Sequence, residues 1–211
     1  MRITKFGHSC LLVEEGKARI LLDPGKWSEG HSEVKDIDAI LITHEHPDHA
    51  HPESLKKILE NNPDVIIYTN EGAGDVLEKE GIRYERVQHG SSFQVRGVTV
   101  EVFGRDHAVI YSSFPIVRNT GYLIAGRLFH PGDALRVPEK AVEILALPVV
   151  APWMRLAECI DYAKQVKPKI CFPIHDGMLK HTGPFHMLPA KLLETAGIEV
   201  KILEPGVTVE F

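Results

Sequence analysis

Thr43–His51 reads THEHPDHAH and follows directly on the apolar run DAILIT at Asp38–Thr43. An apolar run that ends abruptly in polar residues is typical of a buried strand. His44 and His46 point to the same side if the chain stays extended between them. Pro47 favours an extended conformation at His46 and ends the strand. The spacing therefore predicts two imidazoles directed at one point just beyond a buried strand.

Asp48 and His49 leave this strand on a turn, so their side chains are expected to reach a second, nearby point. Neutral imidazoles and carboxylates are common ligands of divalent metal ions. Four histidines within one such short segment are far more than chance supplies in a chain with 12 histidines among 211 residues. The predicted ligands around two neighbouring ions are His44, His46, Asp48 and His49. His51 stands just before an expected helix, where it would cap the helix or be solvated.

The composition is that of an ordinary globular protein. Hydrophobic residues make up 44% of the chain, charged residues 25%, and the net charge is −5. These values exclude a disordered chain, a collagen-like repeat and a disulfide scaffold. The acidic balance and the absence of interleaved aromatic and basic residues indicate that nucleic acid is not a partner.

The termini and the cysteines predict a cytoplasmic protein. Met1–Phe6 is expected to be a strand, and no basic and apolar segments typical of a secretory signal are visible. Ile144–Met154, the most apolar stretch, is far too short to span a membrane. Cys10, Cys159 and Cys171 lie far apart in apolar surroundings, as expected of buried free thiols in a reducing compartment.

Strand patterns alternate with helical patterns along the whole chain. The expected helices are Pro52–Asn62, Gly74–Glu80, Leu156–Val166 and His186–Ala196. The expected strands are Arg2–Phe6, Cys10–Glu14, Ala18–Leu22, Asp38–Thr43, Val65–Thr69, Ile82–Val87, Ser92–Val95, Val98–Phe103, Gly121–Ala125, Arg127–His130, Ile144–Val149, Lys169–Ile174, Ile198–Leu203 and Val207–Phe211. This rhythm predicts an α+β fold in which two mixed sheets are flanked by helices, a four-layer αββα sandwich. No linker or charge block interrupts it, so residues 1–211 are expected to form a single domain.

The pattern H-x-H-x-D-H after a buried strand resembles the signature of the metallo-β-lactamase superfamily of metal-dependent hydrolases. Three later segments match the positions of that superfamily's remaining ligands. They place His107 within RDHA, Asp133 at the end of HPGD and His175 at the end of FPIH. The resemblance extends over nearly the whole chain and implies the metallo-β-lactamase fold and a hydrolytic activity.

The resemblance also implies how the ligands divide. His44, His46 and His107 would hold one ion, Asp48, His49 and His175 the other, and Asp133 would bridge the two. Zinc is the favoured metal, and manganese or iron would also accept such ligands. A hydroxide held between the two ions would attack the substrate. Asp48 would be the catalytic residue that orients the attacking water or shuttles its proton.

Three further residues have weaker support from the sequence. His8 in GHS and Asp23 in LDP resemble motifs of the branch that includes ascorbate-6-phosphate lactonase-like hydrolases, which implies that they orient ligand imidazoles through hydrogen bonds. The alternative is that both are polar residues at strand ends, satisfied by backbone. Trp153 is expected either to wall a substrate pocket or to belong to the core.

Six histidines have no assigned role, namely His31, His51, His89, His130, His181 and His186. His130 is expected to be structural. His181 and His186 follow His175 in a segment rich in Gly and Pro, which is expected to be solvent-exposed and could instead line the mouth of a substrate site.

Departures from particular members narrow the implied activity. Asp133 stands where antibiotic-degrading members use Cys, which argues against a β-lactamase. RDHA differs from the GHT of glyoxalase II-like thioesterases, and His46 stands where flavo-diiron proteins have Glu. The expected reaction is hydrolysis of an ester, lactone or phosphodiester bond in a small molecule. Two alternatives remain, a di-iron oxidoreductase on the same scaffold and a metal-dependent binding module without catalysis. Neither the substrate nor the oligomeric state follows from the sequence.

Overall fold

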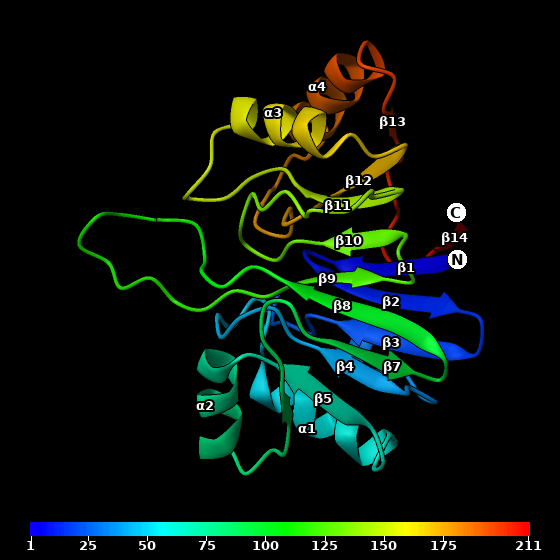
Figure 1. The fold of residues 1–211 in the computed structure, drawn as a ribbon, viewed down its shortest axis with the longest axis vertical. Helices are drawn as coiled ribbons and strands as arrows, with labels where there is room; N and C mark the ends of the chain where they lie inside the picture. The colour runs from blue at the N-terminus through cyan, green and yellow to red at the C-terminus, as the bar shows by residue number, and fades with distance from the viewer.

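The computed structural model describes residues 1–211 and contains two seven-stranded sheets that pack face to face (Figure 1). The strands of the first sheet are β1 (Arg2–Gly7), β2 (Cys10–Glu15), β3 (Ala18–Leu22), β4 (Ala39–Leu41), β5 (Ile66–Thr69), β6 (Glu85–Arg86) and β14 (Thr208–Glu210). The strands of the second sheet are β7 (Ser92–Val95), β8 (Val98–Phe103), β9 (Gly121–Ile124), β10 (Leu128–His130), β11 (Ile144–Pro148), β12 (Ile170–Ile174) and β13 (Glu199–Val200).

Both sheets are mixed and follow the same plan. The first has the order β14-β1-β2-β3-β4-β5-β6 and the second β13-β12-β11-β10-β9-β8-β7. Neighbours are antiparallel from β14 to β3 and parallel from β3 to β6. They are likewise antiparallel from β7 to β10 and parallel from β10 to β13. Two mixed sheets were predicted, and this is confirmed.

Helices supply most of the crossovers that the parallel strands require. They are α1 (Pro52–Asn61), α2 (Glu71–Lys79), α3 (Leu156–Val166) and α4 (Gly183–Glu194), with a short 3₁₀ turn, η1, at His31–Glu33. In Figure 1, α1 and α2 cover the outer face of the first sheet, and α3 and α4 cover that of the second. The predicted four-layer αββα arrangement is thereby confirmed.

Three clusters of buried apolar side chains hold the layers together. The central one has 21 residues and joins the two sheets, with Leu41 from the first sheet and Val100 and Phe172 from the second. The other two clusters seal α3 and α4, and α1 and α2, against the outer faces. All three cysteines are buried and free, as predicted. No helix is long and apolar enough to cross a membrane.

Several element boundaries differ from the prediction. Helix α2 begins at Glu71, three residues early, because the Asn70 side chain accepts a hydrogen bond from the Ala73 amide at 3.1 Å and caps the helix. Helix α4 also begins three residues early, with Pro184 in its first turn, where a missing N–H costs nothing. The stretches expected as strands at 82–87 and 198–203 keep only the two-residue strands β6 and β13.

Candidate metal centre

Strand direction brings the predicted site residues to one edge of the sandwich. The strands β1, β3 and β4 run the same way in the first sheet, because two antiparallel pairings separate β1 from β3 and a parallel one joins β3 to β4. By the same reasoning β8, β10 and β12 run the same way in the second sheet. The residues that follow the carboxyl ends of these six strands are His8, Asp23, the segment from His44 to His49, His107, Asp133 and His175.

Eight of these side chains form two groups whose candidate ligand atoms lie within 4.8 Å of one another. We call His44, His46, His107 and Asp133 the His44 group, and His8, Asp48, His49 and His175 the His49 group. Asp133 connects the two, since its carboxylate oxygens lie 3.2 Å from Nε2 of His49 and 2.9 Å from Nε2 of His175. The structure therefore brings all seven predicted ligands together, and His8, which was predicted only to orient a ligand, lies in the His49 group as well.

Backbone carbonyls fix the proton position on two of the imidazoles. Nδ1 of His107 donates to the Ala108 carbonyl at 2.6 Å, and Nδ1 of His175 donates to the Val150 carbonyl at 2.7 Å. A carbonyl oxygen can only accept, so each Nδ1 carries the proton of the neutral ring. The lone pair of each Nε2 consequently faces the centre and is available to a metal ion.

Side chains fix the other two tautomers. Nδ1 of His49 donates to Oδ2 of Asp23 at 2.7 Å. The Thr43 hydroxyl donates to the same oxygen at 2.8 Å and so accepts from Nδ1 of His44 at 3.0 Å. Asp23 therefore orients one imidazole directly and a second through Thr43, and both Nε2 lone pairs face the centre. His46 differs, because its Nδ1 lies 3.1 Å from Nε2 of His44 and is the atom on the inner side.

The buried inner atoms have no hydrogen-bond partner. This holds for Nε2 of His49, His107 and His175 and for Oδ1 of Asp133. Nevertheless, Nε2 of His107 lies 3.4 Å from Oδ2 of Asp133, and the two Nε2–Asp133 distances given above are shorter still. Four ligands around zinc at 2.0–2.1 Å lie about 3.3 Å apart. Nitrogen and oxygen atoms at this spacing, without hydrogen bonds between them, are typical of ligands around one shared ion. These side chains therefore fit a divalent metal ion.

Electrostatics at the centre favours a cation. Burial opposes charge on His49, but the negative charges of Asp133 and Asp23 outweigh it and raise the pKa of His49 well above its ordinary value, so that without a metal ion Nε2 holds a proton that a bound cation would replace. Burial likewise opposes ionisation of Asp133, yet His49 and His175 hold the pKa of Asp133 well below its ordinary value. The pKa of His44 is lowered by burial first and by His49 second, so that ring stays neutral, as a ligand must.

His8 contacts a predicted ligand instead of a backbone group. Its Nδ1 accepts from the Gly177 amide at 3.2 Å, which leaves the proton on Nε2, and Nε2 donates to Oδ2 of Asp48 at 3.1 Å. Burial lowers the pKa of His8 to about 4, so the ring is neutral. Burial works against ionisation of Asp48 as well, but this hydrogen bond and nearby His49 lower the pKa of Asp48 to about 2. His8 thus holds the Asp48 carboxylate ionised and oriented.

Trp153, between β11 and α3, contacts the carboxylate of Asp133. Its Nε1 donates to Oδ2 of Asp133 at 3.0 Å, and its ring centroid is 5.9 Å from that of His107 and 6.2 Å from that of His175. The indole is half-buried, so Trp153 is not a core residue, and it lies directly beside the centre. Its contribution to a substrate pocket stays a prediction.

Backbone conformation at the centre is unusual. His8, Asp23 and His175 all have positive φ, at 45°, 43° and 61°, which non-glycine residues seldom adopt outside sites that constrain them. At Gly25 a Cβ would lie 1.7 Å from the Asp48 carbonyl oxygen, and at Gly132 it would lie 2.3 Å from the Asn119 side chain. Neither glycine can be replaced without displacing a predicted ligand segment.

The remaining histidines behave differently from one another. His130 is fully buried and its Nε2 bonds to the Ser9 carbonyl at 3.0 Å, as expected of a structural residue. His51 occupies the N-cap position of α1 without a side-chain hydrogen bond to the helix backbone. His181 is exposed. His186 was expected to be exposed too, but this was wrong, because it lies in α4 with Nε2 bonded to Asp176 at 2.9 Å.

Asp176 belongs to a buried charge cluster that the sequence did not reveal. Nζ of Lys5 bonds to both carboxylate oxygens of Asp176, at 2.8 and 2.7 Å, and to the Pro173 carbonyl at 2.8 Å. Since Asp176 directly follows His175, this cluster fixes the chain on both sides of a predicted ligand. The only sequence signal was the His-Asp pair itself, and nothing in it pointed to Lys5.

Comparison with known proteins places this geometry in a family. Residues 2–175 match the model of the Beta-lactamase superfamily domain. The chain belongs to the metallo-β-lactamase superfamily. A curated relative, Protein Rv0786c of Mycobacterium tuberculosis, is 41% identical over 184 residues, which are 85% of each chain. The UPF0173 metal-dependent hydrolase Ta0764 of Thermoplasma acidophilum is 25% identical over 83% of each chain. The chain is accordingly a metal-dependent hydrolase of this superfamily.

Solved structures share the fold. Igni18, a metallo hydrolase from the archaeon Ignicoccus hospitalis, superposes with a TM-score of 0.76 at 21% identity and covers 100% of this chain and 98% of its own. CmlA, a diiron β-hydroxylase from Streptomyces venezuelae, gives a TM-score of 0.77 at 15% identity, with 100% of this chain matching 54% of CmlA. At such identities the likeness concerns the fold alone.

Proposed function

We propose that this protein binds two divalent metal ions, with zinc favoured, and hydrolyses an ester, lactone or phosphodiester bond. The observation that carries the proposal is the set of four imidazoles whose Nδ1 atoms are each committed to an acceptor, while buried, unpartnered atoms converge on Asp133. Manganese or iron would also suit a His/Asp ligand set.

The proposed ligands of one ion are His44, His46 and His107, and those of the other are Asp48, His49 and His175. Asp133 lies between both sets and would be shared. Ions bound there would supply Lewis acidity and would lower the pKa of a coordinated water toward neutrality. Asp48, held ionised by His8, is the residue we propose to orient the attacking water and to accept its proton. Trp153 keeps the Asp133 carboxylate directed inward through its N–H.

A small molecule is the proposed substrate, and nucleic acid is not expected as a partner. The mildly acidic charge balance supports this, because a polyanion would be repelled overall. Three buried free thiols support a cytoplasmic location, where thiols stay reduced.

Metal analysis tests the centre itself. We expect about two equivalents of metal in purified protein, and His107→Ala should lose about one of them, because the His44 group then keeps only His44, His46 and the shared Asp133, while the His49 group is unchanged. His181→Ala is the matched control, since His181 is exposed and outside both groups. Elemental analysis that finds no metal, together with unchanged thermal stability on adding Zn²⁺ or Mn²⁺, would contradict the proposal.

An activity screen on zinc- and manganese-reconstituted protein tests the reaction. Turnover of an ester, lactone or phosphodiester that disappears in Asp48→Asn, measured at a metal concentration that keeps this ligand variant loaded, supports hydrolysis with Asp48 in the proposed role. Full metal occupancy with no turnover on a broad panel would favour a metal-dependent binding module.

A di-iron oxidoreductase is the second candidate, because the shared fold accommodates a diiron enzyme in CmlA. His46 argues against it by the sequence comparison above. Iron in the purified protein with a visible absorption band would favour oxidation–reduction chemistry over hydrolysis.

A further inference from the structure

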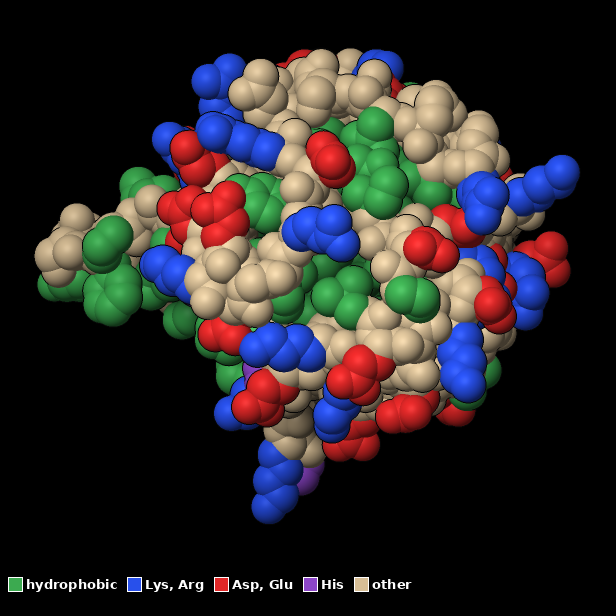
Figure 2. Space-filling view, turned by 90° about the horizontal axis from the view of Figure 1, so that it is seen from below, with side chains coloured by type: hydrophobic (Ala, Val, Ile, Leu, Met, Phe, Trp, Pro, Cys, Tyr) green, Lys and Arg blue, Asp and Glu red, His purple; other side chains and the backbone are tan.

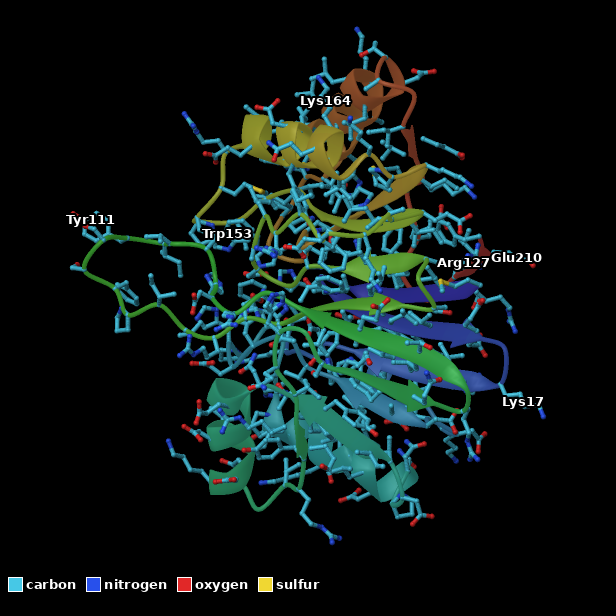
Figure 3. All side chains as sticks on the ribbon, viewed as in Figure 1. Lys17, Tyr111, Arg127, Trp153, Lys164 and Glu210 are labelled. Carbon is cyan, nitrogen blue, oxygen red and sulfur yellow. The ribbon has the colours of Figure 1, made fainter.

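The segment between β8 and β9, residues 104–120, projects from the sandwich. It extends to the left in Figure 1, and the same projection is mostly hydrophobic in the space-filling view of Figure 2. Its exposed apolar side chains are Val109, Ile110, Tyr111, Phe114 and Ile116. Tyr111 lies at its tip and Trp153 at its root (Figure 3). A contiguous exposed apolar surface next to a candidate active site is a feature that folding alone does not require.

The root of this segment is tied to the metal centre. His107 donates from its amide to the Val117 carbonyl at 3.0 Å, and Ala108 donates to the Asp133 carbonyl at 2.8 Å. Asp106 and Arg118 face each other across the root, joined by an ion pair at 2.7 Å. The root of the segment is therefore held in place relative to the predicted ligands.

A pocket of about 150 Å³ lies between the segment and the centre. We call it the apolar subsite, and its eight lining residues include His46, His107, Ile110, Phe114, Ile116 and Val117. Its only polar side chains are two imidazoles that the centre already uses. No charged side chain lines it, so a charged or strongly polar group would lose its hydration there without compensation.

We propose that the apolar subsite binds the apolar group of the substrate, a short branched alkyl chain or a single aromatic ring, next to the bond that is cleaved. The inference rests on the proposed hydrolytic function, because His46 and His107 form both the floor of the subsite and one side of the centre. A dry apolar cavity of about 150 Å³ accommodates benzene, which sets the size. The substrate class is thus an ester, lactone or phosphodiester with a ring-sized apolar substituent.

Binding of product-like anions to the zinc-reconstituted protein tests the subsite. Acetate, butyrate and benzoate are titrated by calorimetry, since each presents the same carboxylate with a different apolar group. Each buried methylene should tighten binding about three- to fourfold, so benzoate and butyrate should bind on the order of tenfold tighter than acetate. Phe114→Ala should weaken benzoate several-fold and leave acetate unchanged. Tyr111→Ser is the matched control, because Tyr111 is an exposed aromatic of the same segment outside the subsite.

A metal-free measurement separates the subsite from the proposed function. Benzyl alcohol added to the metal-free protein should shift the methyl NMR signals of Ile110 and Ile116, and the shifts should vanish in Phe114→Ala but persist in Tyr111→Ser. If these shifts occur while no substrate is turned over, the subsite stands and the hydrolytic proposal falls.

Four results would overturn the subsite. One is equal affinity for acetate and benzoate, and another is an equal effect of Phe114→Ala on both. The third is a halving of the solution mass in Phe114→Ala, which would show that the segment is instead an interface between two copies of this chain. Turnover that shows no preference among apolar substituents, with metal and Asp48 dependence intact, would overturn the subsite and leave the hydrolytic function standing.

Discussion

The two ligand groups of the centre differ in what supports them. In the His44 group the supports are neutral, namely the Thr43 hydroxyl behind His44 and the Ala108 carbonyl behind His107. In the His49 group a carboxylate, Asp23, stands behind His49.

The other members of the His49 group have neutral partners, with one ion pair nearby. The neutral His8 ring donates to Asp48 and the Val150 carbonyl accepts from His175, while the ion pair of Lys5 with Asp176 stands beside His175. A carboxylate behind an imidazole raises its basicity and its affinity for metal. We therefore expect an ion in the His49 group to be held more tightly, whereas one in the His44 group, with half-buried His46 facing the apolar subsite, would exchange more easily.

The largest effect is expected where the two groups meet. Asp133→Ala should reduce the metal content from about two equivalents to nearly none, because both groups lose the carboxylate that neutralises charge between the ions. Asp161→Ala, an exposed aspartate on α3, is the control. Retention of one full equivalent, measured by elemental analysis, would show that Asp133 serves one group alone and would break the comparison.

The second-largest effect is expected on the free energy of unfolding and comes from the ion pair of Lys5 with Asp176 beside His175. Asp176→Ala should destabilise the metal-free protein by about 3–5 kcal/mol, because it leaves the Lys5 ammonium buried without a partner. Urea unfolding measures this change. The double variant Lys5→Met/Asp176→Leu removes both charges and should recover most of the loss. Equal destabilisation in the single and double variants would mean that packing, and not charge, supports this side of the centre.

The charged Asp23 and the neutral Thr43 should affect metal affinity unequally. Asp23→Asn should weaken the tighter site about 10–100-fold, whereas Thr43→Val should change affinity only a few-fold, because a neutral acceptor polarises His44 less. Competition with a chelator gives both values. Equal effects of the two substitutions would contradict a difference between the groups.

The smallest effect is expected from acidification, which should lower the free energy of unfolding through Asp176. Burial opposes ionisation of Asp176, but His186 and Lys5 lower its pKa below the ordinary 3.8. When the pH falls through 3.8, Asp176 binds a proton in the unfolded chain before it does so in the folded protein. The stabilisation present at neutral pH is therefore lost on acidification. In metal-free protein the decline in unfolding free energy below pH 4 should be shallower in Lys5→Met/Asp176→Leu than in the unchanged chain. Parallel declines would contradict this.

Much of the fold and the gathering of the site could be predicted because both depend on local signals. An apolar run that stops at a histidine marks the end of a buried strand, and residues at the ends of like-directed strands meet at one edge. His44 stands at such an end, whereas His107, Asp133 and His175 were placed by the resemblance to the superfamily, and the structure brings all four together.

What could not be predicted depends on contacts between distant segments. The acceptor behind His175 is the Val150 carbonyl, and every residue carries a carbonyl, so the sequence contains no signal for it. Lys5 and Asp176 are brought together only by the register of the folded sheets. The early start of α4 was missed because a glycine and a proline were taken as loop residues, although proline suits the first turn of a helix.

The proposed ligands come from both sheets and are separated by up to 131 residues along the chain, from His44 to His175. Ions bound between them would therefore act as removable cross-links, closing a long loop of chain as a disulfide would. Such a link stabilises the folded state by mass action, so resistance to heat and proteolysis should rise with the free concentration of metal. The metal supply around this protein would then set its lifetime as well as its activity.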